Sequence, residues 1–345
     1  MKKKSVLFIG PFPPPHSGDT VKNHEIYDFL RKCEVKTSFY NTYWSKLHQA
    51  ILFLLIPFFL IFYDKIIFSF NRRARYFFLP FSVFFNFLFF YKCELHLIVI
   101  GGVFDVEIKR IPSIIRTTYV SLLKKIKTIY VESNKLVEGL SDLNIKNAVY
   151  LPNIRKKTNY CATELRTDET LKLVFISRIV KMKGCVVLAN AVKSLIKENI
   201  PVALDFYGPV SESFSGEFNA LLIKEKVEYK GVLTFYEVPE CLRNYDVLVF
   251  PTLYETEGQP GIIIEAMMAG RAIITFPFRS SEEFLINDEN AIVLEKRDEE
   301  LLKDSILKLV TNRDLVKKLG REALKKSTHF ELSSWEKNIF EWLCK

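Results

Sequence analysis

The sequence predicts an α/β protein of two domains, each built on a parallel β-sheet with helices on both faces. Three observations lead to this prediction. Apolar runs of strand length alternate with segments of helical periodicity, a pattern typical of parallel sheets that are buried on both faces. The runs form two series, and a polar segment separates them. The chain has 345 residues, of which 49% are hydrophobic, so it is long enough and apolar enough for two cores.

The first series contains four expected strands, at 5–10, 65–70, 95–102 and 128–133, and three expected helices, at 19–32, 47–62 and 76–91. The second contains five expected strands, at 171–177, 202–208, 227–231, 246–251 and 271–276, and five expected helices, at 184–198, 216–225, 236–244, 260–269 and 299–311. The polar segment between the series begins with Pro152 and Asn153. We therefore expect domains at 1–160 and 161–328, and we expect the amphipathic tail, 329–345, to form a helix that crosses back to the first domain.

The cysteines and the first residues suggest a cytoplasmic protein. The six cysteines show no pair at metal-ligand spacing, which favours reduced thiols over a zinc site or a disulfide framework. The chain begins with a short basic stretch and about five apolar residues before a proline cluster. This apolar run is too short for a signal peptide and is expected to form the first strand.

Positive charge is concentrated in the first half of the chain. Residues 1–160 contain 24 Lys and Arg against 11 Asp and Glu, whereas residues 161–345 contain 25 against 29. A basic surface favours an anionic partner, either a membrane or a nucleic acid. Because the sequence has no helix-turn-helix, zinc-finger or RNA-recognition signature, no nucleic-acid partner is expected.

Two segments rich in phenylalanine, 50–63 and 76–91, resemble membrane spans but are shorter than the roughly 20 residues that a span needs. Pro57 and Pro80 also interrupt them. Two interpretations of these segments remain: they form helices buried against the sheet, or they form helices that dock on an anionic membrane surface. The docking alternative rests on nearby cations, which are Lys46, Lys65, Arg72, Arg73, Arg75 and Lys92.

A loop rich in proline and glycine, 10–20, follows the first strand directly. The carboxyl end of a first strand is where doubly wound sheets bind ligands, often at the start of a helix. His16 is a candidate hydrogen-bonding group there. The glycine spacing does not match a dinucleotide-binding fingerprint, and a plain connection remains the alternative.

Arg178 and Lys183 follow the strand 171–177, and Gly184 begins a helix. Two cations beside the positive end of a helix suit a diphosphate, because charge-assisted hydrogen bonds to such an anion are strong. The alternative is a pair of solvated surface cations.

Two carboxylates, Glu257 and Glu265, belong to the segment that follows the strand 246–251. Glu265 lies in an otherwise apolar run, where an ionised carboxylate needs a partner. Carboxylates accept hydrogen bonds from hydroxyl groups, so a sugar and a ribose are suitable partners. The alternatives are a helix-capping role for Glu257 and, for Glu265, a hydrogen bond to a backbone group.

These segments together resemble retaining glycosyltransferases of family 4, which have the GT-B fold. The segment EGQPGIIIEAMMAG resembles the family's motif of two glutamates separated by seven residues, and FISRIVKMKG resembles its phosphate-binding segment. YLPN, VEYKGVL and FIGPFPPPHSGDT resemble its interdomain, base-binding and amino-terminal glycine segments, in the family's order. The resemblance implies two Rossmann-like domains that face a central cleft.

The resemblance also implies roles for individual residues. Arg178 and Lys183 would bind the donor diphosphate, Glu257 would hold the transferred sugar, and Glu265 would bind the ribose. The donor site would further include Gly18, Gly231, Val232, Gly258, Gln259, Pro260 and Gly261. Candidate acceptor residues are His16, Gly101, Gly102 and Asp105. A histidine element that many members carry is absent here, since His96 falls within a strand.

The expected function is therefore transfer of a hexose, with retention of configuration, from a nucleotide-diphosphate sugar to a lipid-linked saccharide at the inner face of the cell membrane, in the synthesis of a cell-surface polysaccharide. No metal cofactor is expected, because the two cations and the helix dipoles can stabilise the leaving diphosphate and the sequence has no Asp-x-Asp motif. Two other functions remain alternatives. One is another sugar-nucleotide enzyme of the same fold, an epimerase or phosphorylase, and the other is a non-enzymatic membrane-associated binding protein.

Overall fold

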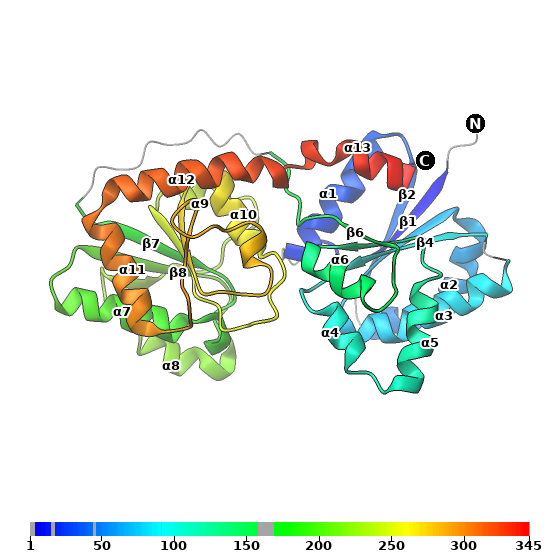
Figure 1. The fold of residues 1–345 in the computed structure, drawn as a ribbon, viewed down its shortest axis with the longest axis horizontal. Helices are drawn as coiled ribbons and strands as arrows, with labels where there is room; N and C mark the ends of the chain where they lie inside the picture. Colours follow the sequence, from blue (N-terminus) through cyan, green and yellow to red (C-terminus); the bar gives the residue numbers. More distant parts are fainter. Residues whose placement is uncertain (1–3, 15–17, 44–45, 91, 158–168, 345) are drawn as a thin grey trace. The chain divides into compact units, whose positions relative to one another are not determined.

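The computed structural model describes residues 4–14, 18–43, 46–90, 92–157 and 169–344. The chain divides into two compact units (Figure 1). Unit 1 comprises residues 1–156 and 331–345, and unit 2 comprises residues 157–330. The tail after residue 330 thus belongs to unit 1 as a series of short helical turns that includes α13 (Glu336–Ile339) and not as one continuous helix.

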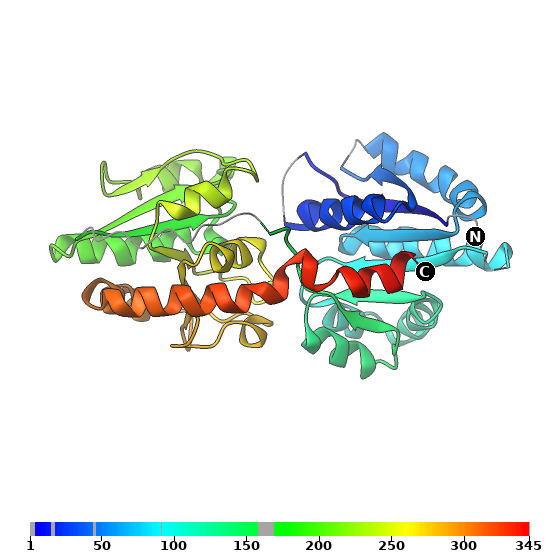
Figure 2. The same ribbon diagram turned by 90° about the horizontal axis from the view of Figure 1, so that it is seen from above.

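Unit 1 contains a sheet of six parallel strands in the order β2-β1-β3-β4-β5-β6. The strands are β1 (Ser5–Gly10), β2 (Lys36–Asn41), β3 (Lys65–Phe70), β4 (Glu94–Val99), β5 (Thr128–Val131) and β6 (Ala148–Tyr150). The helices are α1 (Gly18–Lys32), α2 (Lys46–Phe62), α3 (Arg72–Leu88), α4 (Phe104–Lys109), α5 (Ser113–Leu123) and α6 (Asn134–Ser141). One face of the sheet packs on α2 to α6, and the other packs on α1 and the carboxyl-terminal turns (Figures 1 and 2).

Unit 2 repeats this architecture with the strand order β12-β11-β10-β7-β8-β9, again parallel. The strands are β7 (Leu171–Ile176), β8 (Val202–Tyr207), β9 (Val227–Tyr229), β10 (Val247–Phe250), β11 (Ala272–Thr275) and β12 (Ile292–Val293). The helices are α7 (Cys185–Lys197), α8 (Ser215–Asn219), α9 (Val238–Arg243), α10 (Gly261–Met268), α11 (Glu299–Thr311) and α12 (Arg313–Ser327). The predicted α/β class with two parallel sheets is confirmed.

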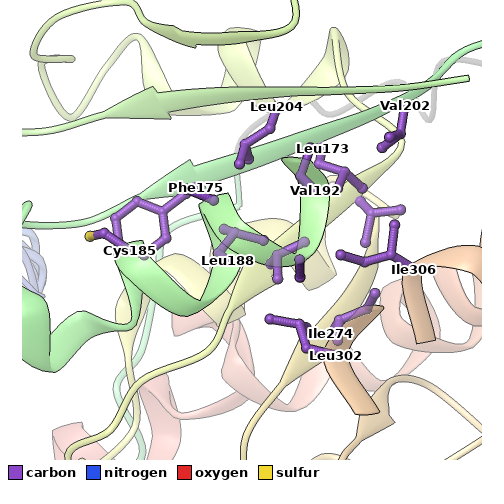
Figure 3. Close-up of a cluster of buried hydrophobic side chains, with 14 of the residues drawn as sticks. Leu173, Phe175, Cys185, Leu188, Val192, Val202, Leu204, Ile274, Leu302 and Ile306 are labelled. Atoms are coloured by element: carbon purple, nitrogen blue, oxygen red, sulfur yellow. The ribbon is translucent and has the colours of Figure 1, made fainter. Parts of the chain in front are cut away.

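Buried aliphatic and aromatic side chains hold the helices of unit 2 on its sheet. Figure 3 shows one such cluster, in which Phe175 and Leu204 of the sheet meet Leu188 of α7 and Leu302 of α11. These side chains are fully buried. Each contributes roughly 1.5–3 kcal/mol of hydrophobic free energy on burial. This packed core holds the strands in position and thereby fixes the start of each loop at the strand ends.

The two phenylalanine-rich segments are the helices α2 and α3, and both combine buried and exposed apolar side chains. Leu52 and Leu79 are fully buried, whereas Leu54, Phe62 and Phe77 are 72%, 72% and 67% exposed. The helices therefore pack on the sheet and still present an apolar surface. Within the described residues, no helix has both the length and the hydropathy that crossing a membrane requires.

Two of the cations expected near a membrane surface are buried instead. Arg75 is 1% exposed and donates a hydrogen bond of 2.7 Å to Glu107. Lys65 is 2% exposed and forms an ion pair of 3.2 Å with Glu94. Both cations therefore pair with carboxylates of unit 1. Their positions next to apolar segments of the sequence did not indicate a membrane-facing surface.

Candidate active site

The order of the strands in unit 2 reverses between β7 and β10, which are neighbours in the sheet but far apart in the sequence. In doubly wound sheets, ligands bind at such a switch point, at the carboxyl ends of the strands. Arg178 and Lys183 follow β7, and Glu257 follows β10. The topology thus brings the two sequence segments that carry these candidate residues to the same edge of the sheet.

Gly184 fixes the path of the chain after β7. It has a φ of +83°, and a Cβ atom at this position would lie 2.0 Å from the carbonyl oxygen of Pro251. Only glycine fits so close to that backbone at a positive φ. The start of α7 is therefore held against the loop after β10, and the preceding turn, Lys181–Lys183, brings Lys183 to this loop.

Lys183 and Glu257 form an ion pair in this place. The Lys183 side chain is 9% exposed and that of Glu257 is 16% exposed. The Thr252 hydroxyl donates a hydrogen bond of 3.2 Å to the same carboxylate oxygen. The ammonium group of Lys183 also lies 5.1 Å from the ring centre of Phe250 and 5.3 Å from that of Tyr254. These contacts fix both charged groups in position.

A cavity of about 250 Å³ lies beside this pair. It is lined by Arg178, Lys183, Tyr254, Thr256 and Glu257. The lining thus carries two cations and one carboxylate, together with hydroxyl groups from Tyr254 and Thr256. Such a set can bind an anion and hold a neutral hydroxyl-bearing group next to it.

The segment after Glu257 leads into α10 and buries two further candidate residues. Gln259 is 3% exposed, and Glu265, in the second turn of α10, is 7% exposed. The Ser280 hydroxyl donates a hydrogen bond to the carbonyl of Gly258, which fixes this segment before Pro260 and Gly261. Glu265 is not among the residues that line the cavity, so a ribose contact from this residue stays a prediction.

Gly231 and Val232 follow β9 at the same edge of the sheet. Gly231 has a φ of +95°, and its carbonyl accepts a hydrogen bond of 2.9 Å from the backbone N–H of Gly208, just after β8. Val232 is 62% exposed. The exposed Val232 side chain is therefore available to a flat apolar ligand group, such as a nucleotide base.

In unit 1 the structure places the acceptor candidates at the carboxyl ends of the strands. Gly101 and Gly102 follow β4, and Asp105, in α4, is 2% exposed. Gly18 begins α1, whereas His16 lies outside the described residues. The roles of these residues stay predictions.

The sequence analysis did not identify two buried polar contacts in unit 1. Lys22 donates hydrogen bonds to Glu132 and to the carbonyl of Leu151, at 3.2 and 3.1 Å. Burial lowers the pKa of Lys22, and the charge of Glu132 opposes this shift. His96 is 1% exposed, its Nδ1 lies 3.2 Å from the Tyr130 hydroxyl, and burial lowers its pKa. No short motif marks either contact, because the partners are distant in the sequence.

The two parallel α/β sheets belong to the GT-B fold class, as a comparison with solved structures shows. A solved structure of Anabaena HepE in complex with UDP and glucose aligns over 99% of both chains, with a TM-score of 0.74 and 14% identity. At that identity the likeness concerns the fold. The predicted GT-B fold class is thus confirmed.

Residues 157–326 match the family described as Glycosyl transferases group 1, and this segment covers nearly all of unit 2. An uncharacterised glycosyltransferase of Methanocaldococcus jannaschii is 26% identical over 175 residues, which are 50% of this chain and 44% of that protein. A capsular polysaccharide biosynthesis glycosyltransferase of Staphylococcus aureus is 25% identical over 160 residues, 46% of this chain and 42% of that protein. The chain spans about half the length of the curated relatives that it matches. These findings support a group 1 glycosyltransferase.

Proposed function

We propose that the protein is a retaining glycosyltransferase that transfers a hexose from a nucleotide-diphosphate sugar to a lipid-linked saccharide. The observation that carries the proposal is the arrangement of Arg178, Lys183 and Glu257 around one cavity at the switch point of unit 2. This arrangement offers cations to a diphosphate and a carboxylate to an adjacent sugar.

In the proposed reaction, the bond between the anomeric carbon of the sugar and the diphosphate breaks, and negative charge develops on the leaving phosphate. The acceptor hydroxyl forms the new bond to the same face of that carbon and gives its proton to the leaving phosphate. Arg178 and Lys183 stabilise this charge, so that the reaction needs no metal ion. Glu257 accepts hydrogen bonds from the hydroxyl groups of the sugar, and Glu265 accepts them from the ribose. Gly231 and Val232 border the base.

The comparisons support two parts of this proposal, the identity of the donor nucleotide and the role in polysaccharide synthesis. The HepE structure holds UDP and glucose, which favours a uridine nucleotide donor here as well. The match to a capsular polysaccharide glycosyltransferase favours a role in the synthesis of a surface polysaccharide.

We infer a peripheral membrane location from the apolar surface of α2 and α3. Exposed apolar side chains on these helices include Leu54, Phe58, Phe62, Phe77, Phe84 and Phe87. Helices with such a surface bind in the interfacial layer of a membrane. A lipid-linked acceptor would be met at this location, at the inner face of the cell membrane.

The direct test is a transfer assay. The protein is incubated with UDP-, GDP- and ADP-sugars and with lipid extract as a source of acceptor, and acceptor-dependent release of nucleoside diphosphate is measured. Proton NMR of the product then gives its anomeric configuration. Transfer that is abolished in Lys183→Ala supports the proposal. Inversion would contradict the retaining mechanism, and turnover of the donor alone with a changed sugar would indicate an epimerase.

Membrane binding is tested separately by sedimentation with vesicles. The double variant Leu54→Ser/Phe62→Ser should lose most of the bound fraction. Tyr236→Ser is a matched control, because Tyr236 is also exposed, at 73%, but belongs to unit 2. Equal sedimentation of the double variant and the control would refute a role of α2 in docking.

A further inference from the structure

A groove in unit 1, separate from the cavity of unit 2, has the character of a site for an amphipathic anion. We propose that it binds the phosphate and the adjoining hydrocarbon chain of the lipid-linked acceptor, an inference that rests on the proposed glycosyl transfer. The groove has a volume of about 460 Å³ and runs between α3 and α5, with α4 at one end. Figure 1 shows these three helices on the same side of the sheet.

The groove begins at the edge of the sheet where a ligand is expected. The strand order of unit 1 reverses between β1 and β3, and α3 starts directly after β3, with Asn71 as its amino-terminal cap. Arg72, in the first turn of α3, therefore lies at the carboxyl end of a strand at the switch point, as ligand-binding residues of doubly wound sheets do.

The lining of the groove has an excess of positive charge. It includes two arginines, Arg72 and Arg110, and one carboxylate, Glu107. Glu107 is already engaged by the buried Arg75, at 2.7 Å, and lies 3.7 Å from Arg72. Since Arg75 balances the charge of Glu107, the two remaining arginines leave an excess of positive charge. Arginine pairs at such a position bind phosphate groups well, because each presents several donors.

A buried hydroxyl group provides an independent observation. Tyr119 lines the groove, is 4% exposed, and its hydroxyl has no hydrogen-bond partner among the described residues. Buried polar atoms without a partner are rare in native proteins. The surrounding atoms cover this hydroxyl in the structure, and a small movement of the Tyr119 side chain on binding would let an acceptor oxygen of a ligand in the groove become its partner.

The remainder of the groove is apolar. Pro80, Ile111, Ile115 and Leu122 line it, and Ile115 is 60% exposed. A free phosphate would leave this apolar part open to water, and a plain hydrocarbon would leave the arginines without an anion. A phosphate attached to a long hydrocarbon chain satisfies both parts, which is the chemistry of a lipid-linked acceptor.

The test measures binding of dodecyl phosphate, below its micelle concentration, by calorimetric titration. Inorganic phosphate probes the cationic part of the groove, and dodecyl maltoside probes the apolar part. Each should bind at least tenfold more weakly than dodecyl phosphate. The double variant Arg72→Ala/Arg110→Ala should lose about tenfold or more in affinity for dodecyl phosphate, and Ile115→Asn should lose several-fold. Arg73→Ala and Ile114→Asn are matched controls, because these exposed neighbours do not line the groove, and both should bind as the wild type does.

Three results would overturn the inference. The first is unchanged affinity for dodecyl phosphate in the double arginine variant. The second is equal losses in the control variants, which would indicate a general surface effect. The third is a parallel loss of vesicle binding in the double arginine variant, which would indicate a membrane-docking surface instead of an acceptor site.

Binding of a nucleoside diphosphate to unit 2 is measured in the same samples and should stay unchanged. If the groove binds dodecyl phosphate but no sugar donor is turned over, the proposed transfer fails; if transfer persists in all variants, only the groove assignment fails.

Discussion

The contact between Lys183 and Glu257 predicts an unusual phenotype for one substitution. Glu257→Gln should tighten binding of the nucleoside diphosphate and at the same time lower the rate of sugar transfer. The structure pairs the carboxylate with Lys183, one of the two cations proposed to bind the diphosphate. The carboxylate therefore cancels part of the charge that attracts the ligand, and glutamine removes this cancellation while it keeps the shape of the side chain.

Coulomb's law gives the size of the effect. A phosphate that binds Lys183 comes within about 4 Å of the Glu257 carboxylate, and two like charges at that distance repel by about 1 kcal/mol in water and about 4 kcal/mol at an effective dielectric constant of 20. The Glu257 side chain is 16% exposed and lines an open cavity, which places the effect near the lower value. An increase in affinity of about fivefold is expected, whereas transfer should fall because the sugar loses a charged acceptor.

The assay is calorimetric titration with UDP, combined with the transfer rate at saturating donor. Glu255→Gln is the matched control, because Glu255 belongs to the same loop but is 78% exposed and pairs with Arg297. It should change neither quantity. Circular dichroism establishes that the variants are folded. Weaker UDP binding in a folded Glu257→Gln protein would refute the reasoning, since it would mean that the carboxylate organises the phosphate site and does not compete with the phosphate.

Three further substitutions test the site of unit 2 and the stability of unit 1. Gly184→Ala should cost about 3 kcal/mol of unfolding free energy in a urea titration, because of the positive φ and the close carbonyl. Gly216→Ala is the control: Gly216 belongs to the helix α8 and has open space around it, so this change should be neutral or slightly stabilising. Equal losses in the two variants would contradict the argument. Glu265→Gln should weaken UDP and the donor sugar equally, by about tenfold, and unchanged UDP affinity would remove the ribose contact. The neighbouring imidazole of His96, 3.8 Å away, together with the ammonium group of Lys65 and opposed by burial, lowers the pKa of Glu94 from 4.5 to about 2. This depressed pKa adds stability that is present above pH 4.5 and lost as the pH falls toward 2, so Glu94→Gln should lose less stability than the wild type over that range.

The sequence predicts the buried strands well and the short edge elements poorly. The fully buried, mainly apolar strands such as β3 and β10 are recognisable because both of their faces are buried. The edge strand β2, with the sequence KTSFYN, is partly exposed and carries mostly polar residues, so it lacks that signal. The outer strands β6 and β12 have three and two residues, too few for any periodicity to be detected.

The helix α5 shows how tertiary context overrides local preference. Its sequence, SIIRTTYVSLL, is rich in β-branched residues that favour strands. It nevertheless forms a helix that buries Tyr119 and Leu123 and leaves Ile114 84% exposed. Sequence periodicity could not reveal this helix, and it therefore could not reveal the groove that α5 forms with α3.

The candidate site of unit 2 was predictable in part, and the reason is topological. Residues that follow neighbouring parallel strands must meet at one edge of the sheet, so the proximity of the β7 and β10 loops follows from the strand assignment. The direct pairing of Lys183 with Glu257, and the contact of Thr252 with the same carboxylate, depend on the path of each loop. That path is set by contacts such as the one between Gly184 and Pro251, which only the folded structure shows.

The two units consequently differ in what can be inferred about them. The match to the group 1 glycosyltransferases covers residues 157–326, and the cations and carboxylate proposed for the donor all belong to that segment. Unit 1 lies outside it and carries both the apolar surface of α2 and α3 and the arginine-lined groove. If donor chemistry resides in unit 2, we expect the choice of acceptor to depend on features of unit 1, which the family match does not cover. Substitutions in the groove should therefore change which acceptor is used and leave UDP binding intact, whereas substitutions at Lys183 or Glu257 should change UDP binding for every acceptor.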